Sequence, residues 1–253
     1  MIPRKELVAY LQKFLKVNDF KDYCPNGLQV EGRAEIKHIV AGVTASQSLI
    51  DQAIEQQADA ILVHHGYFWK GEEPAIVGIK QKRIKALLQA DINLLAYHLP
   101  LDAHTEVGNN AQLARMLELT DVSSQDVNGV NDILWRGGLK QGLSASGVAQ
   151  LLNSRLGREA LWLPSSSNQS IKTLAWCSGG AQSYIEQAAE LGVDAFISGE
   201  ASEQTTHLAK ELDIHYFAAG HHATERYGVQ ALAAHLAEKF AISYQFIDID
   251  NPV

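Results

Sequence analysis

The chain has 253 residues, enough for one large domain or two modest ones. Its composition is 46% hydrophobic and 20% charged, with 19 Gly and 6 Pro, which is typical of a folded globular protein and excludes disordered and collagen-like classes. The formal charge of −8 disfavours broad binding to nucleic acid or to an anionic membrane, because both require a dense cationic surface.

The N-terminus and the cysteines indicate a cytoplasmic protein. Residues 1–17 mix charges with apolar positions and lack a small-residue cleavage site, so we expect an amphipathic helix and not a signal peptide. No apolar run approaches the ~20 residues of a membrane-spanning helix, so we expect no membrane partner. Cys24 and Cys177 are too few for a disulfide framework and are interpreted as inert core thiols in a reducing compartment.

A segment of the first half recurs in the second half. Residues 43–65 align without a gap on residues 178–200. The identical pairs are Gln47/Gln182, Ser48/Ser183, Ile50/Ile185, Gln52/Gln187, Ala53/Ala188, Glu55/Glu190, Asp59/Asp194 and Ala60/Ala195. Such a density of identities in an ungapped window indicates an internal duplication.

Each copy has the pattern of a β-α-β unit: an apolar run, a helix with apolar positions three and four apart, and a second apolar run. A further helix and strand follow each copy, with the strands at residues 92–98 and 214–220. Continuous apolar strands that alternate with helices indicate parallel sheets with helices on both faces. We therefore predict an α/β fold of two duplicated domains with mostly parallel sheets, 1–125 and 126–253, divided in the polar stretch 121–132.

Histidine or acidic side chains follow each of four predicted strands. Ligands of open α/β sheets collect at the carboxyl ends of strands, where these side chains would lie. Imidazole and carboxylate are ligands of Zn, Mn, Fe, Co or Ni, and the absence of a nearby cysteine argues against a purely structural zinc site. Five of them form the predicted metal centre: His64, His65, Asp102, His221 and Glu225.

Five ligands exceed the needs of one tetrahedral ion and suit two divalent ions ~3.5–4 Å apart. His221 and Glu225 are four residues apart where a helix over residues 223–239 is expected to begin, so they can face the same way. Water between two such ions ionises near neutral pH and becomes a nucleophile. Hydrolysis is therefore the predicted reaction class.

Structural interpretations compete with these assignments. A single histidine at a strand end is more often a hydrogen-bonded cap than a ligand, and adjacent histidines converge only if the backbone turns at Gly66. His98 and His222 are assigned to orienting a ligand or to proton transfer, with a structural role as the alternative. Glu200 is assigned as a carboxylate that orients a ligand or carries a proton.

Aromatic residues follow the histidine pair directly. Tyr67 and Phe68, with Trp69, are assigned to a pocket wall for the flat base of a substrate, with core packing as the alternative. The glycine-containing turn at residues 178–183 precedes a helix, where backbone N–H groups can hold a phosphate. Because no P-loop lysine accompanies it, a plain tight turn is the preferred interpretation.

These residues lie in segments that resemble the YbgI-like dinuclear metal proteins, often labelled GTP cyclohydrolase type 2 homologues. The matching segments are YCPNGLQVEG (23–32), GVTAS (42–46), ADAILVHHGYFWKG (58–71), HLPLDAH (98–104), GNN (108–110), VDAFISGE (193–200) and AGHHATE (219–225). The resemblance implies a duplicated α/β fold and a two-metal centre with the same five ligands. It also implies a ring-shaped homohexamer, built as a trimer of dimers, with the metal sites facing an internal cavity.

The resemblance implies hydrolytic opening of the guanine imidazole ring of GTP with loss of formate. Relatives are also linked to tolerance of radiation damage, including DNA damage, and to disposal of damaged nucleotides. We therefore predict a metal-dependent hydrolase acting on a nucleotide or a related heterocycle. The alternatives are a non-enzymatic hexameric scaffold or metal store, and a DNA-threading ring, which the charge of −8 disfavours.

Overall fold

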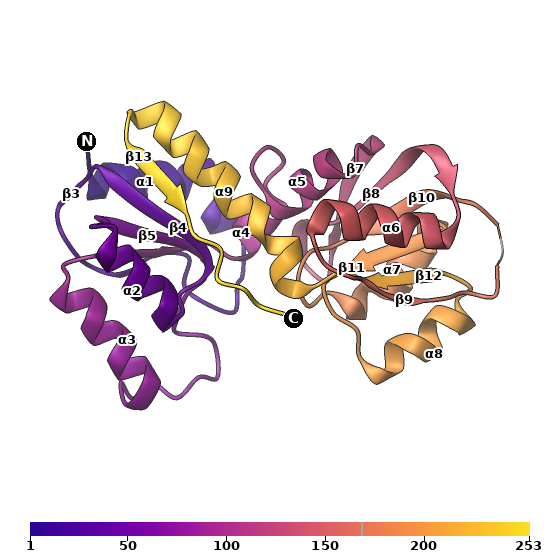
Figure 1. Cartoon of the computed structure of the whole chain (residues 1–253), viewed down its shortest axis with the longest axis horizontal. Coiled ribbons are helices and arrows are strands. Elements are labelled where there is room, and N and C mark those ends of the chain that lie inside the picture. Colours follow the sequence, from indigo (N-terminus) through magenta and orange to yellow (C-terminus); the bar gives the residue numbers. More distant parts are fainter. Residues whose placement is uncertain (168) are drawn as a thin grey trace. The chain divides into compact units, whose positions relative to one another are not determined.

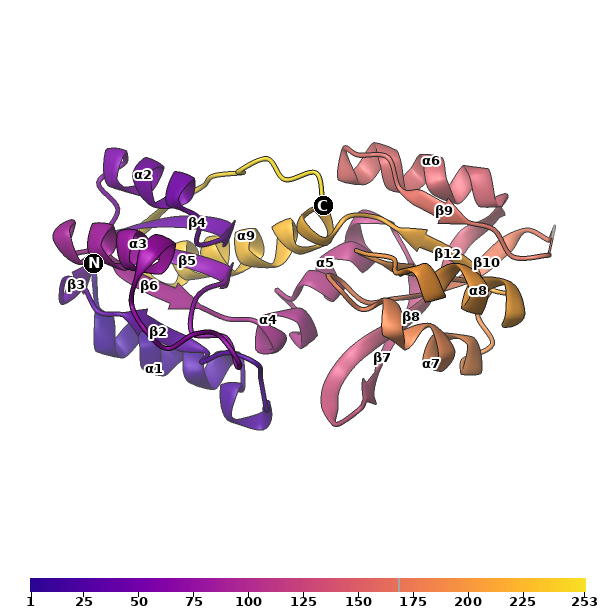
Figure 2. The same cartoon turned by 90° about the horizontal axis from the view of Figure 1, so that it is seen from below.

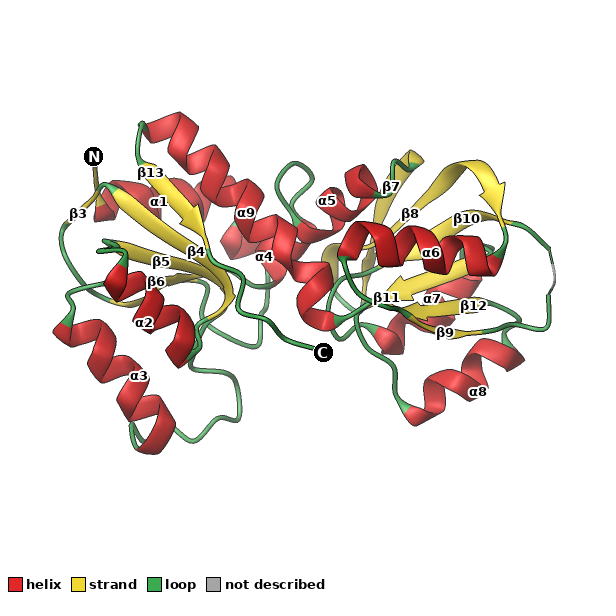
Figure 3. Ribbon diagram, in the orientation of Figure 1, coloured by secondary structure: helices red, strands yellow, loops and turns green. Residues whose placement is uncertain are grey.

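The chain has an α/β fold, as the alternation of apolar strands and helices predicts. The structure is a computed structural model that describes residues 1–167 and 169–253. Figure 1 traces the elements in chain order and Figure 3 separates helices from strands. Among the described residues, no helix combines the length and the apolar character needed to cross a lipid bilayer.

The chain divides into two compact units. Unit 1 comprises residues 1–101 and 228–250, and unit 2 comprises residues 102–227 and 251–253. This division differs from the predicted boundary near residue 125, because the polar stretch 121–132, expected to contain the boundary, folds into an antiparallel hairpin within unit 2.

That hairpin joins β7 (Thr120–Val127) to β8 (Val130–Leu143). Its turn is Asn128-Gly129, and both residues have positive φ, 51° and 79°. An Asn-Gly pair favours this tight hairpin turn because both residues tolerate the left-handed conformation. The Asn-Gly pair therefore indicates a β-hairpin inside the polar stretch that the sequence analysis interprets as the domain boundary.

Unit 1 is built on a five-stranded sheet in the order β13-β4-β5-β6-β2. Its first three pairings are parallel and only β2, at the edge, is antiparallel to its neighbour. The strands are β2 (Gly27–Val30), β4 (His38–Thr44), β5 (Ala60–His65), β6 (Asn93–Ala96) and β13 (Ser243–Phe246). Two short strands, β1 (Ile2–Pro3) and β3 (Glu35–Ile36), pair separately.

Helices cover both faces of the unit 1 sheet. The helical elements are α1 (Arg4–Phe14), η1 (Val17–Asp19), α2 (Gln47–Glu55), α3 (Gly78–Gln89) and the later part of α9 (His221–Phe240). Leu49 of α2 and Leu87 of α3 belong to one buried cluster with Val40 of β4. Figure 2 shows α1 on the opposite side of the sheet, and Tyr10 of α1 packs on His235 of α9.

Unit 2 contains a six-stranded sheet in the order β7-β8-β10-β11-β12-β9. Its central pairings, β10 with β11 and β11 with β12, are parallel, whereas the outer ones are antiparallel. The additional strands are β9 (Leu161–Leu163), β10 (Ile171–Trp176), β11 (Ala195–Ser198) and β12 (His215–Ala218). The prediction of mostly parallel sheets is thus right for unit 1 and wrong for unit 2, where a hairpin and an edge strand extend a parallel centre.

The helices of unit 2 also lie on both faces of their sheet. They are α5 (Asn109–Met116), α6 (Ala145–Leu156), η2 (Gln182–Tyr184), α7 (Ile185–Glu190) and α8 (Glu203–Glu211). Leu152 of α6 and Ala114 of α5 share a buried cluster with Trp176 of β10. Two helices, α9 and the short α4 (Leu99–Ala103), cross the division between the units along the chain.

The two units share one order of elements, β-α-β-α-β, and one stabilising contact. Asp59, which precedes β5, accepts hydrogen bonds from the N–H groups of Lys37 and His38 at the start of β4. Asp194, its counterpart in the aligned repeat, accepts equivalent bonds from Lys172 and Thr173 in β10. The identity at this position therefore preserves a carboxylate that ties the start of one parallel strand to its neighbour.

Replacing Asp194 by Asn should lower the free energy of unfolding by about 1–2 kcal/mol at pH 7, because charged hydrogen bonds to Lys172 and Thr173 are lost. Burial alone would raise the pKa of Asp194, but these donors outweigh it and lower the pKa. The stabilisation is therefore present above the unfolded pKa of about 4 and is lost as the pH falls through the lower folded value. Urea unfolding at several pH values measures this difference, with the exposed Glu190→Gln as control, and a difference independent of pH would contradict it.

Candidate metal centre

The side chains that could hold a metal ion fall into two sets, one in each unit, and comprise the five predicted ligands and His98, which was predicted to orient a ligand or to transfer a proton. The first ligand set is His64, His65 and His98 in unit 1. The second ligand set is Asp102, His221 and Glu225 in unit 2. Every member lies at or just beyond the carboxyl end of a parallel strand, where the fold collects polar groups.

The three imidazoles of the first ligand set converge. The ring centroids of His64 and His65 are 4.6 Å apart, and those of His98 lie 5.1 and 5.7 Å from them. One nitrogen of each ring lies within 4.8 Å of the others. Successive side chains of a strand normally point to opposite faces, but His65 is the last residue of β5 and the chain leaves the sheet at Gly66.

Hydrogen bonds decide which nitrogen of each imidazole faces a ligand. His64 Nδ1 lies 2.9 Å from the carbonyl oxygen of Tyr97, which can only accept, so Nδ1 carries the proton and Nε2 is the lone-pair nitrogen. His65 Nδ1 lies 3.1 Å from Thr44 Oγ1. These contacts fix ring orientation in the way that partners of metal-bound histidines do.

His98 is held by Asp22, a residue that the sequence analysis missed. Its Nδ1 lies 2.7 Å from Asp22 Oδ1, and Asn26 Oδ1 accepts the backbone N–H of His98 at 2.7 Å. Burial alone would raise the pKa of Asp22, but the contact with His98 outweighs it and lowers the pKa. Asp22 and His98 are 76 residues apart, so no local pattern joins them.

The aromatic residues after the histidine pair have different surroundings. Tyr67 is buried, its hydroxyl donates to the carbonyl of Ala45 at 2.7 Å, and burial raises its pKa. The ring of Phe68 lies under Lys80 Nζ at 5.1 Å. Trp69 alone of the three has its ring beside the ligand set, with its centroid 5.0 Å from that of His98. A substrate contact by Tyr67 or Phe68 stays a prediction.

The second ligand set brings two buried carboxylates together. Asp102 and Glu225 are 5% and 2% exposed, and a carboxylate oxygen of each lies within 4.8 Å of the other. Asp102 Oδ1 accepts hydrogen bonds from Asn109 Nδ2 at 2.8 Å and from Ser178 Oγ at 2.9 Å. Two buried like charges at this separation are costly unless a cation compensates them, so this pair suits a divalent metal.

His221 links the second ligand set to Glu200. Its Nδ1 lies 2.6 Å from Glu200 Oε1 and its Nε2 lies 3.2 Å from Glu225 Oε2. Burial alone would lower the pKa of His221, but Glu225 and Glu200 outweigh it and raise the pKa to about 9. Glu200 thus holds the ring of His221. The backbone N–H of His222 donates to the Val253 carbonyl at 2.9 Å, and the role predicted for its side chain stays a prediction.

The glycine-containing loop after β10 supports these ligands and does not form a phosphate cradle. Its Ser178 N–H donates to Asn110 Oδ1 at 2.9 Å, and its Gly179 N–H donates to Thr224 Oγ1 at 3.0 Å. Gly179 has a φ of 67°, and a Cβ there would clash with Glu225 Oε1. The loop is therefore a tight turn whose backbone approaches the carboxylate too closely for any side chain.

The donor atoms fit a divalent transition metal better than a thiolate site. Both cysteines are buried and unpaired with each other. Burial, assisted by Asp22, raises the pKa of Cys24 to about 12, and burial also raises the pKa of Cys177. Cys24 lies within ligand distance of Asp22 and His98. Because both thiols stay protonated at neutral pH, the clustered imidazoles and carboxylates are the better ligands for a metal ion.

Comparison with known proteins gives one consistent result. Residues 2–252 match the family described as Duf34/NIF3 (NGG1p interacting factor 3). A protein of Allochromatium vinosum named "GTP cyclohydrolase 1 type 2 homolog" is 54% identical over 248 residues, which cover 98% of this chain and 96% of that protein. A structure of protein ybgI has a TM-score of 0.95 at 48% identity, and one from Thermus thermophilus 0.91 at 37%, each covering 100% of both chains.

Replacing Gly179 by Ala should weaken metal binding at least about tenfold, because the methyl group displaces Glu225 and pushes on His221. Gly192→Ala is the matched control, since Gly192 has the same φ of 67° but no atom within 4 Å of the position that a Cβ would take. In both variants the left-handed backbone conformation lowers the free energy of unfolding by about 1 kcal/mol. Urea unfolding measures this loss in each variant, so that it can be separated from the effect on metal binding. Equal metal content of the two purified variants would contradict the assignment.

Proposed function

The chain belongs to the Duf34/NIF3 family, and from this premise we propose that it is a metal-dependent hydrolase acting on a nucleotide or a related heterocycle. Its proposed ligands, shared by two divalent ions, are His64, His65, Asp102, His221 and Glu225. The names of its relatives support the substrate class. Assembly into a ring-shaped homohexamer is part of the same proposal.

One observation carries the metal assignment. Each imidazole of the proposed ligands has Nδ1 bonded inside its own unit, to Tyr97 O for His64, to Thr44 Oγ1 for His65 and to Glu200 Oε1 for His221. In all three rings Nε2 is therefore the nitrogen placed to coordinate. Metal-bound histidines almost always have such a partner on the nitrogen that faces away from the metal, so the shared arrangement supports coordination through Nε2.

The residues around the ligands have roles in binding, orientation and proton transfer. Divalent ions, when bound, supply Lewis acidity and a nucleophile at neutral pH. Glu200 orients His221, as Asn109 and Ser178 orient Asp102. His98 is assigned to proton transfer, because it is partly exposed and its Nδ1 lies 2.7 Å from the carboxylate of Asp22.

The aromatic ring beside the first ligand set supports a flat substrate. Trp69 is half-buried, and its Nε1–H donates to the Gly66 carbonyl at 3.2 Å, which holds the indole in place. Its ring lies next to His98 and His65, at 5.0 and 5.9 Å between centroids. A purine base stacked on Trp69 would therefore lie beside the imidazoles, where hydrolytic ring opening could take place.

Turnover tests the hydrolase proposal. Protein loaded with Mn or Fe, offered GTP and oxidised nucleotides, should release formate, phosphate or a ring-opened product. His64→Ala and Asp102→Ala should reduce turnover at least ~100-fold through loss of a ligand, with the particle mass measured by light scattering unchanged. The exposed His207→Ala is the control and should keep full activity. Metal binding without turnover of any substrate would favour the scaffold instead.

Replacing Glu200 by Ala should weaken metal binding by about 10–100-fold, because His221 loses the partner that orients it. Glu200→Gln keeps an acceptor oxygen and should fall between the wild type and Glu200→Ala. Glu203→Ala is a matched control, because it removes an exposed carboxylate from His207, outside both ligand sets. Competition with a chromogenic chelator measures the affinity, and an unchanged affinity in Glu200→Ala would remove Glu200 from the site.

A further inference from the structure

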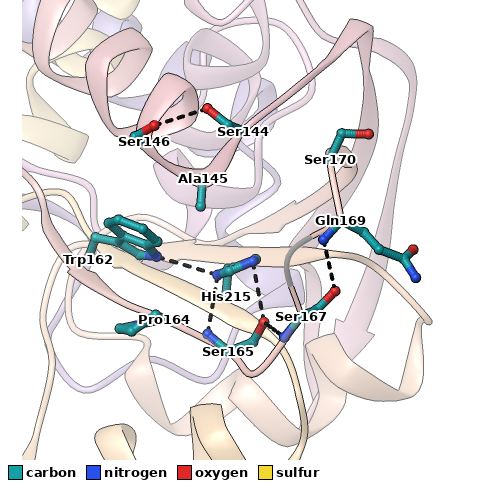
Figure 4. A pocket seen from close by; sticks show the side chains of 10 residues that line it. All are labelled: Ser144, Ala145, Ser146, Trp162, Pro164, Ser165, Ser167, Gln169, Ser170 and His215. Carbon is teal, nitrogen blue, oxygen red and sulfur yellow. Dashed lines mark hydrogen bonds between the residues drawn. The ribbon is translucent and has the colours of Figure 1, made fainter.

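A second candidate site lies in unit 2 and includes no member of the ligand sets. It is a cavity of about 360 Å³, close to the lower end of the volumes of small-molecule sites. The cavity lies among the start of α6, the edge strand β9 and the start of β12 (Figure 4). We call it the serine pocket, after its principal lining residues Ser144, Ser146, Trp162, Ser165, Ser167 and His215.

The serine hydroxyls are arranged as donors. Ser167 Oγ accepts the N–H of Gln169 at 3.2 Å. Ser144 Oγ accepts the N–H of Gly147 at 3.1 Å and shares a hydrogen bond with Ser146 Oγ at 3.0 Å, so one of these two hydroxyls keeps its hydrogen for a ligand. Ser165 Oγ accepts the N–H of Ser167 at 3.1 Å. A hydroxyl oxygen that accepts a backbone N–H still has its own hydrogen to donate. The pocket therefore offers several O–H donors to the acceptor oxygens of a ligand.

His215 holds this lining in place and does not activate a nucleophile. Its Nδ1 accepts the N–H of Ser165 at 3.2 Å and the indole N–H of Trp162 at 3.4 Å, so Nε2 carries the hydrogen and donates to Ser165 Oγ at 3.3 Å. Burial lowers the pKa of His215, so the ring is neutral at pH 7. With its proton on the side of Ser165, the imidazole cannot act as a base toward that hydroxyl, and the pocket suits binding and not hydrolysis.

The pocket suits an uncharged ligand. Among the described residues that line it, none is Lys, Arg, Asp or Glu. A phosphate or a carboxylate would leave water for a site without a fixed counter-charge, in a chain with a formal charge of −8. A neutral ligand rich in oxygen atoms has no such desolvation cost, while it satisfies the same hydroxyl donors.

Trp162 adds an apolar surface beside these donors. Its indole packs nearly parallel to the Phe217 ring, at 6.4 Å between centroids and 15° between planes, and the residue keeps 37% of its surface exposed. Its indole N–H is directed to His215, which sets the orientation of the ring (Figure 4). A rigid aromatic face next to hydroxyl groups matches a sugar ring, which has an apolar C–H face and a polar edge.

We propose that the serine pocket binds the hydroxylated ring of a pentose or a hexose, either as a free sugar or as the ribose of a nucleoside. The ring stacks on Trp162, and its hydroxyl oxygens accept hydrogen bonds from Ser165 and Ser167. The neutral lining selects against phosphorylated forms. This site is independent of the proposed metal centre.

Ligand-detected NMR with the full chain tests the proposal, with D-ribose, D-glucose and guanosine as probes. At least one probe should saturate the protein in the millimolar range, and Ser165→Ala and Trp162→Ala should each weaken binding by about three- to tenfold. Ser154→Ala is the matched control, because this serine of α6 bonds to the Leu151 carbonyl and does not line the pocket. Binding of guanosine alone assigns the site to nucleosides, and binding of either sugar assigns it to free sugars.

The proposal fails if no probe saturates, if neither variant changes the affinity, or if a chelator abolishes binding and so places the probe at the metal centre. Competition by inorganic phosphate would also overturn it in favour of an anion site. Trp162→Phe keeps an aromatic ring and should retain part of the affinity. Circular dichroism of each variant confirms that a loss of binding is not a loss of fold.

Discussion

Burial of charge is the constraint on which the candidate metal centre depends. An ionised carboxylate that leaves water loses several kcal/mol of solvation, and two that lie close together also repel each other. Asp102 and Glu225 meet this constraint with polar partners from separate elements: Asn109 and Ser178 for the first, and His221 for the second. The need to stabilise these two charges therefore explains why polar residues surround them, without reference to any reaction.

The same constraint accounts for the glycine at the turn after β10. Because Gly179 has no side chain, the backbone of its loop approaches Glu225 while its N–H bonds to Thr224 on the same helix. The loop therefore holds the helix start that carries His221 and Glu225. In unit 1, by contrast, the imidazoles of His64 and His65 are oriented by a carbonyl and a hydroxyl, so the two units use different partners on equivalent strand ends.

The serine pocket and the second ligand set show two solutions for polar groups within one unit. Asp102 and Glu225 are two buried carboxylates that lie close together, which suits a cation. Around His215 the polar groups are neutral hydroxyl and amide groups, and the imidazole itself is kept neutral by burial. The chemistry of a ligand follows from this difference more directly than from the volume of either site.

The sequence by itself determined the α/β class, the strand ends that carry histidine or carboxylate, and the repeat in which Asp59 and Asp194 correspond, because hydrophobic periodicity and local order are written along the chain. It misplaced the division of the chain, since an Asn-Gly hairpin lay in a polar stretch. Only the tertiary structure decided that Asp22 holds His98 and that Tyr97 orients His64. These contacts join residues that are far apart in the chain or involve a backbone carbonyl, so no local sequence pattern predicts them.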